Sequence, residues 1–270
     1  LLGPVFHFIE KKFNLLQSTA NYNDNIHLNI IYYSFLLIKY DNITRNPHLK
    51  NSAVNLISMC IKKTHLLSQL ESKLEQINFN CEIKNSIIEI LLNYFINIES
   101  YDSNGLNFKL NIRFQLFYII RYLCMENVYE YKFKKYINEN KNRSCQLAHL
   151  ILSDFSETFS EGLQKLEELK TLEAETDSNS NNYSYVQNYL IKVGLSSFII
   201  IEEILEFFIL LTQTCNYIFS EPELGQHLVE NITYFLHPLL GSDKDKYTIE
   251  EPHRCHFIPE KIIFQISKIY

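Results

Sequence analysis

The sequence predicts an all-α protein made of stacked helical hairpins, an α-solenoid of the armadillo or HEAT kind. Three observations predict this class. Apolar residues recur every three to four positions along most of the chain, which is the period of one helix face. Glycine and proline, which interrupt helices, occur only 6 times each in 270 residues. Short turns join successive periodic segments, although no clean repeat is present, so the pattern supports helices more directly than a solenoid.

The first half of the chain divides into helices at turn-forming residues. Asn46 can cap a helix and Pro47 suits its first position, so a helix should begin there, with a break near Thr64. The Asp-Ser-Asn-Gly cluster at 102–105 is typical of a turn. We therefore expect helices over Phe6–Ala20, Ile26–Tyr40, Pro47 to the region of Leu70, Cys81–Ile98, Ile112–Met125 and Tyr129–Ile137.

The second half begins with a segment that we expect to be the longest helix, from Leu147 to the region of Ala174. The polar run that follows, at about 175–183, lacks apolar residues and is predicted to be a mobile loop. Periodic helix resumes at Tyr185. One apolar stripe runs along the long helix and consists of Leu147, Ile151, Phe155, Phe159, Leu163, Leu166 and Leu169.

The outer face of this long helix is acidic, and Lys165 and Lys170 relieve only part of its charge. A solvated helix face is our main interpretation, and an electrostatic contact with a basic partner is the alternative. The acidic residues are Asp154, Glu157, Glu161, Glu167, Glu168, Glu173 and Glu175.

The most apolar stretch of the chain is Leu195–Leu211, and Glu202, Glu203 and Glu206 interrupt it. Three carboxylates near the centre of a membrane span would cost roughly 3 kcal/mol each. We therefore expect a buried helix with one acidic edge and no contact with a membrane.

A helix start is predicted after residue 219. Ser220 and Glu223 have the spacing of a capping box, and Phe219 and Leu224 flank it as a hydrophobic staple would. The apolar stripe that follows consists of Leu224, Leu228, Ile232, Phe235 and Leu239.

Gly241 is expected to close this helix in a left-handed conformation, and Pro238 to kink or loosen its last turn. A second helix should begin near Pro259, after a polar loop. Its apolar stripe consists of Ile262, Ile263, Ile266 and Ile269.

Charge and cysteine usage exclude several classes of protein. The net charge of −6 without a basic stripe disfavours nucleic-acid binding. The 6 cysteines are scattered, without a Cys-x-x-Cys pair, which is typical of reduced thiols in an intracellular protein. No signal peptide is visible, and because the chain starts without Met we expect it to be a fragment.

One cluster has metal-binding residue types, namely His253, Cys255 and His256. A second Cys/His pair at ordinary spacing is missing, and His237 could join only through the fold. We interpret the cluster as loop packing, with zinc as the alternative, and predict no metal ligand and no cofactor.

Catalytic motifs are also missing from the sequence. Asp243-Lys244-Asp245 is too small to replace the carboxylate cluster with which helical isoprenoid synthases hold magnesium. Cys145 and Cys255 are conceivable transthiolation nucleophiles, but neither has a Cys-His-acid setting. We therefore name no catalytic and no cofactor-binding residue.

Three parts of the chain share their order and spacing with a known family. Two are FKLNIRFQLFYIIRYL (108–123) and AHLILSDFSETFSEGLQKLEELKTLE (148–173). The third comprises Phe219, Pro222, Glu223, Leu224, Leu228, Tyr234, Leu236, Leu240, Gly241, Pro252, Phe257, Pro259, Ile266 and Tyr270.

These parts resemble the ubiquitin elongating factor core, the helical region that precedes the U-box in chain-elongation factors of the ubiquitin-fusion-degradation type. Weaker similarity reaches Leu2-Gly3-Pro4, so residues 1–270 look like the C-terminal part of that core. The chain departs from the family at Ser242, where proline is usual, and at Cys124, where an aromatic residue is common.

The resemblance implies a helical scaffold that positions a U-box, which is expected downstream of residue 270 and is absent here. The whole protein would extend polyubiquitin on already ubiquitinated substrates for proteasomal degradation. Its implied partners are a ubiquitin-conjugating enzyme bound through the U-box, ubiquitinated substrates, an AAA-type segregase and proteasome shuttle factors, in the cytoplasm or nucleus. One alternative is an armadillo- or HEAT-type interaction scaffold without ubiquitin chemistry. Another is a helical enzyme, which the missing catalytic motifs disfavour.

Overall fold

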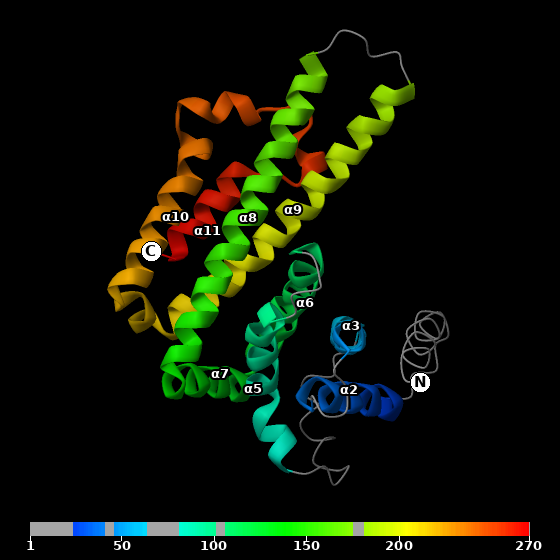
Figure 1. Cartoon of the computed structure of the whole chain (residues 1–270), viewed down its shortest axis with the longest axis vertical. Helices are drawn as coiled ribbons and strands as arrows, with labels where there is room; N and C mark the ends of the chain where they lie inside the picture. Colours follow the sequence, from blue (N-terminus) through cyan, green and yellow to red (C-terminus); the bar gives the residue numbers. More distant parts are fainter. Residues whose placement is uncertain (1–23, 41–45, 64–80, 101–105, 175–180, 270) are drawn as a thin grey trace. The chain divides into compact units, whose positions relative to one another are not determined.

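The protein is mainly helical in the part that a computed structural model describes, which is residues 24–40, 46–63, 81–100, 106–174 and 181–269 (Figure 1). No strand occurs in these ranges, so the all-α prediction is confirmed. The chain forms two compact units, 1–140 and 141–270. Four expectations lie wholly or partly outside the described residues: the helix over Phe6–Ala20, the chain after Thr64, the turn at 102–105 and the loop predicted at about 175–183, of which 175–180 is not described.

The first unit contains five described α-helices and a short 3-10 turn, η1. Helix α2 packs on α3, α3 on α6, and α7 on both α5 and α6, so neighbouring helices pair as expected for a solenoid-like all-α fold. The elements are α2 (Asp24–Lys39), α3 (Pro47–Lys63), α5 (Cys81–Asn97), η1 (Ile98–Ser100), α6 (Leu106–Cys124) and α7 (Asn127–Glu139).

Two helix starts in the first unit can be compared with the positions predicted from the sequence. The predicted cap of α3 is confirmed, because the His48 backbone N–H donates to the Asn46 side-chain oxygen at 2.9 Å. Helix α6 begins at Leu106, six residues before the predicted start. The ring of Phe108 packs edge-on against His48, with centroids 4.9 Å apart, and this contact with α3 orders the first turn.

A buried cation joins η1 to α6. Arg113 is 2% exposed, its Nη2 donates to a Glu99 carboxylate oxygen at 2.6 Å, and its guanidinium lies 5.1 Å from the centre of the Phe95 ring. Partial burial alone would raise the pKa of Glu99. Hydrogen bonds from Arg113 and Lys109 outweigh it, so the pKa of Glu99 is lowered.

The second unit is built on an antiparallel hairpin of two helices, α8 (Lys141–Ala174) and α9 (Asn181–Thr214), of 34 residues each (Figure 1). Each is about 50 Å long. The predicted stripe of α8 is confirmed, since all seven of its residues are buried.

Helix α8 begins at Lys141, before the predicted start at Leu147, and the Lys141 ammonium lies 5.8 Å from the centre of the Tyr217 ring. Helix α9 begins at Asn181, so 181–183 is helix instead of predicted loop.

Asp154 does not belong to the acidic outer face of α8, where the sequence placed it. It is only 2% exposed and lies on the inward side with Ile151 and Phe155. The helical period is 3.6 residues per turn, so the edge of the apolar stripe passes through position 154. The acidic face therefore begins at Glu157.

Two further helices pack on this hairpin, α10 (Pro222–Leu240) on α8 and α11 (Pro259–Ile269) on α9, and they also touch each other. Their predicted stripes are largely confirmed: Leu224, Phe235 and Leu239 are buried on α10, as are Ile262, Ile266 and Ile269 on α11. The described residues of this unit also form three 3-10 segments, namely η2 (Asn216–Ser220), η3 (Ser242–Tyr247) and η4 (Pro252–Cys255).

The predicted capping box at the start of α10 is wrong. The residue that precedes the helix is Glu221, without a side-chain cap, because η2 runs through Ser220 and Pro222 takes the first helical position. The staple is wrong for the same reason. The Phe219 ring packs on Phe208 instead, with centroids 5.3 Å apart.

The predicted left-handed cap at Gly241 is also wrong, since this residue is extended with φ −81° and ψ −171°. Glycine is needed there for space, because a Cβ would collide with the carbonyl oxygen of His237. Helix α10 continues through Pro238 to Leu240, so the proline does not end it.

Gly225 and Gly194 form a matched pair for a stability test. A Cβ on Gly225 would lie 2.7 Å from the backbone oxygen of Phe219, whereas one on Gly194 would meet Cys255 Sγ at an ordinary 3.4 Å. Alanine in a helix interior normally stabilises by roughly 1 kcal/mol. We expect Gly194→Ala to raise the free energy of unfolding and Gly225→Ala to lower it by about 1–3 kcal/mol. Urea unfolding followed by circular dichroism measures both, and a stabilising Gly225→Ala would contradict the close approach.

Candidate functional site

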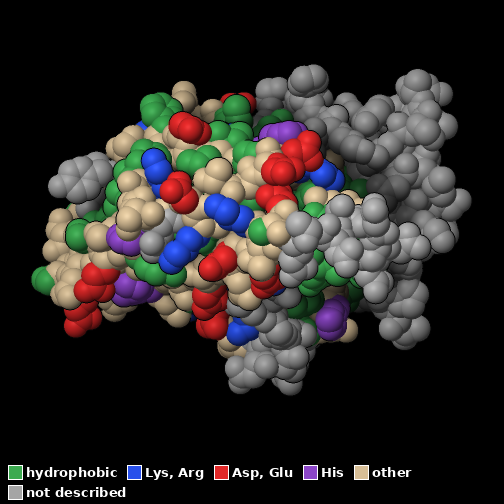
Figure 2. Space-filling view, turned by 90° about the horizontal axis from the view of Figure 1, so that it is seen from above, with side chains coloured by type: hydrophobic (Ala, Val, Ile, Leu, Met, Phe, Trp, Pro, Cys, Tyr) green, Lys and Arg blue, Asp and Glu red, His purple; other side chains and the backbone are tan. Residues whose placement is uncertain are grey.

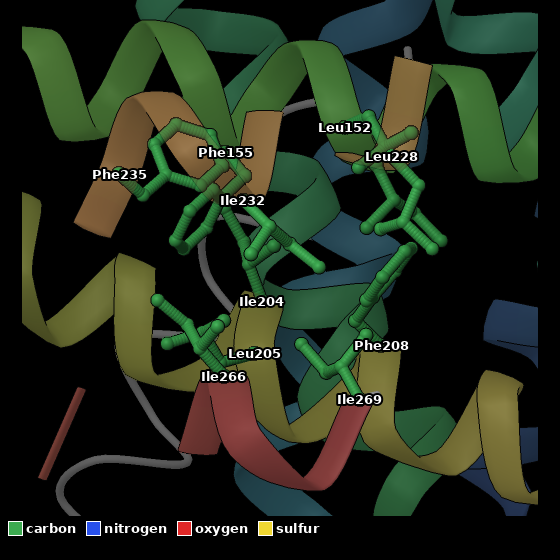
Figure 3. A pocket seen from close by; sticks show the side chains of 11 residues that line it. Leu152, Phe155, Ile204, Leu205, Phe208, Leu228, Ile232, Phe235, Ile266 and Ile269 are labelled. Atoms are coloured by element: carbon green, nitrogen blue, oxygen red, sulfur yellow. The ribbon is translucent and has the colours of Figure 1, made fainter. Parts of the chain in front are cut away.

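The candidate site is the C-terminal helical pair, defined as α10 and α11, where it sits on α8 and α9. All four helices contribute to one apolar pocket (Figure 3). Leu228, Ile232 and Phe235 of α10 point into it opposite Ile204 and Phe208 of α9. The lining residues are Ile151, Leu152, Phe155, Ile204, Leu205, Phe208, Leu228, Ile232, Phe235, Ile266 and Ile269.

An aromatic cluster fixes α10 on α8. The Phe235 ring meets Phe155 edge-on, with centroids 4.2 Å apart, and Phe159 at 5.2 Å. Each such pair contributes about 0.5–1.5 kcal/mol beyond the area it buries. The cluster therefore sets how far along α8 the helix α10 lies.

Polar side chains fix α11 on α9, and we call this set the α9–α11 clamp: Glu202, Glu206, His256, Lys261 and Gln265. Glu202 lies 2.5 Å from the Lys261 ammonium and 2.7 Å from His256 Nε2. One turn further along α9, Glu206 accepts a hydrogen bond from the Gln265 amide at 2.7 Å. Because the two carboxylates stand four residues apart on one helix face, they hold α11 at two points along its length.

The protonation of Glu202 reflects these contacts. Its side chain is 31% exposed, and burial alone would raise its pKa. Hydrogen bonds from Lys261 and His256 outweigh burial, so the pKa of Glu202 is lowered from its ordinary value of 4.5. The ionised carboxylate is therefore the form that the folded clamp favours.

The turn before α11 presents His256 to the clamp. His256 has φ 55°, a left-handed conformation that ends η4 and is uncommon outside glycine. Its neighbours anchor the turn: Cys255 is buried beside Gly194, and the Phe257 ring packs on Phe198 with centroids 4.8 Å apart.

The structure separates the residues that the sequence singled out as possible metal ligands. His256 contacts Glu202, Cys255 points into the core, His253 is exposed, and His237 lies at the end of α10 beside Gly241. Throughout 24–40, 46–63, 81–100, 106–174 and 181–269, no three His, Cys, Asp or Glu residues gather closely enough to hold a metal ion.

The two thiols considered as nucleophiles have raised pKa values. Burial, and secondarily the Glu221 carboxylate, raises the pKa of Cys145. Burial raises the pKa of Cys255 to about 11. The thiolate is the reactive form, so neither cysteine is activated at neutral pH.

Internal contacts occupy part of the acidic face of α8. The Lys165 ammonium pairs with Glu168 at 2.8 Å, and the backbone N–H of Glu250 donates to the Glu173 carboxylate at 3.2 Å. Lys170 donates to the backbone oxygen of Asp245 in η3. Figure 2 shows acidic and basic side chains standing beside one another on one face of the molecule.

None of the described helices combines the length and apolarity that a membrane span needs. The stretch Leu195–Leu211 lies within α9, where Phe198, Ile201 and Phe207 are buried against other helices. Its acidic edge, predicted from sequence, holds the clamp carboxylates Glu202 and Glu206.

The contacts of this helical pair fix α10 and α11 on the hairpin, and comparison with known proteins identifies the family of the chain. The family model described as ubiquitin elongating factor core matches residues 5–270. The chain belongs to this family. It is 20% identical over 244 residues to the probable ubiquitin conjugation factor E4 of Arabidopsis thaliana, covering 84% of this chain and 23% of that protein. It is 23% identical over 239 residues to the ubiquitin conjugation factor E4 of Schizosaccharomyces pombe, covering 85% and 24%.

The chain therefore spans about a quarter of the length of the curated relatives it matches. Within this part of the elongating factor core, sequence reasoning found the carboxylates of the clamp but missed their partners. Those partners lie 54 and 59 residues further along the chain. The signal that could have found the clamp is the pair of glutamates four residues apart in an otherwise apolar helix, because carboxylates partly removed from water require partners.

Leu228 and Val229 provide a test of the packed face of α10. Leu228 lines the apolar pocket, and its neighbour Val229 is 57% exposed. We expect Leu228→Asp to lower the free energy of unfolding by roughly 2–5 kcal/mol, because it removes apolar contacts and places a carboxylate in an apolar site. Val229→Asp should change it by less than about 0.5 kcal/mol. Equal unfolding curves for the two variants would show that the face is assigned incorrectly.

The clamp predicts a pH-dependent stability. Because the pKa of Glu202 is lowered in the folded state, its contribution is present above its ordinary pKa of 4.5 and is lost as pH falls through the folded value. We expect Glu202→Gln to lower the melting temperature by roughly 2–4 °C at neutral pH, and the difference from wild type to vanish in strong acid. Thermal unfolding across pH measures it, with the exposed Glu167→Gln as control. A difference that persists unchanged in acid would contradict the ionised contact.

Proposed function

We propose that this chain is the C-terminal part of an elongating factor core and serves as a rigid helical scaffold in ubiquitin chain elongation. The observation that carries the proposal is the family match over residues 5–270. The whole protein would extend polyubiquitin on substrates that already carry ubiquitin, for proteasomal degradation. A U-box following the core would recruit the charged ubiquitin-conjugating enzyme.

The packing of α11 supports a positioning role. Ile262, Ile266 and Ile269 bury one face of this helix, and the α9–α11 clamp holds another. A short helix held by both apolar and charged contacts has a fixed direction. Fixed orientation of reacting groups lowers the barrier of a bimolecular step, so a scaffold contributes to transfer without a catalytic residue of its own.

The proposed partners follow from this role. They are the ubiquitin-conjugating enzyme, ubiquitinated substrates, an AAA-type segregase and proteasome shuttle factors, in the cytoplasm or nucleus. The competing function is that of an armadillo- or HEAT-type interaction scaffold without ubiquitin chemistry.

A reconstituted reaction tests the proposal with activating enzyme, a panel of conjugating enzymes, ubiquitin and a mono-ubiquitinated substrate. We expect residues 1–270 alone to build no chains and the whole parent protein to build them. Chains made by residues 1–270 would reveal a catalytic site in this part. A parent protein inactive with every conjugating enzyme would favour the plain scaffold.

The same assay tests whether the direction of α11 matters. We expect the parent protein with both Glu202→Gln and Glu206→Gln to make shorter chains while binding the conjugating enzyme as before. Val229→Asp, on the exposed face of α10, serves as the matched control and should leave chain length unchanged. Unchanged chain length in the double variant would show that the clamp does not contribute to chain elongation.

A further inference from the structure

Two histidines from different helices of the second unit face each other away from the clamp. His149 of α8 and His227 of α10 are 78 residues apart in sequence, and their Nδ1 atoms are 3.4 Å apart. The rings are stacked, with centroids 5.5 Å apart and planes inclined by 30°. His149 is exposed and His227 half-buried, so the pair is open to solvent.

This separation suits a shared metal ion. Two imidazole nitrogens that each bind zinc at about 2.0–2.1 Å with a tetrahedral angle are about 3.3–3.4 Å apart. We propose that His149 and His227 form a two-histidine site for a divalent transition-metal ion of the imidazole-preferring group, represented by Zn²⁺. Because no third His, Cys, Asp or Glu among the described residues completes a cluster, water fills the remaining coordination positions.

The surrounding contacts hold the pair in place before an ion binds. The Phe155–Phe235 contact, about two turns away on the same two helices, fixes α8 against α10. The Asn231 side-chain amide donates to the backbone oxygen of His227 at 2.8 Å and braces that turn of α10. A bound ion therefore links two helices that are already in register, and little conformational freedom is lost on binding.

Without metal, the same geometry accommodates a hydrogen bond in which one Nδ1–H donates to the other Nδ1. On metal binding that proton moves through solvent to Nε2 of the same ring, so that both Nδ1 lone pairs bind the ion. The site departs from the sequence-based expectation of no metal ligand, which rested on residues close together in sequence. A pair of this kind has two protein ligands, so it binds more weakly than a four-ligand structural zinc site.

Thermal unfolding of the 270-residue chain in a non-chelating buffer at neutral pH tests the site. We expect about 1 mM ZnCl₂ to raise the melting temperature by roughly 3–8 °C, because the ion binds the folded state in preference to the unfolded one. His149→Gln and His227→Gln should each abolish the rise. His253→Gln, at an exposed histidine in η4, is the matched control and should keep it.

Chemical modification gives an independent measurement on the wild-type protein. Zn²⁺ should protect His149 and His227, but not His253, from carbethoxylation by diethyl pyrocarbonate, as read by peptide mass spectrometry. No melting shift together with no protection would overturn the proposal. A shift that survives in both variants would assign the ion to another site and overturn it as well.

Discussion

The second unit depends on the burial of α8 against α9. Helices of 34 residues expose long apolar faces, and most helical stability in proteins comes from packing such faces together. Once the two are paired, Phe155 of α8 and Ile204 of α9 lie on one side of the hairpin, in the apolar pocket shared with α10 and α11. The positions of the last two helices therefore follow from the register of the first two.

Periodicity predicted most of this arrangement, because a 3.6-residue pattern reports directly on which face is buried. The whole stripe of α8 and the cap at Asn46 are confirmed. Helix ends were less predictable, because contacts between distant segments decide them. The Phe108 ring on His48 extends α6, and η2 with Pro222 displaces the expected capping box of α10.

The site could be predicted only in part. The sequence places glutamates at 202 and 206 in an apolar helix, but a single sequence does not reveal that Lys261 and Gln265 meet them. The His149–His227 pair is hidden for the same reason. Local motifs are informative when ligands are neighbours in sequence, whereas a scaffold of paired helices builds its polar sites between distant turns.

The distance between clamp partners has a consequence for biosynthesis. Glu202 precedes His256 and Lys261 by 54 and 59 residues, so it leaves the ribosome well before either partner. At about 5–20 residues per second the interval is roughly 3–12 seconds. Helix α9 ends at Thr214, so during most of that time the α8–α9 hairpin is complete while the apolar side that α11 later covers is open. Until α11 has been synthesised and packs on α9, this apolar side stays exposed to chaperones that bind nascent chains.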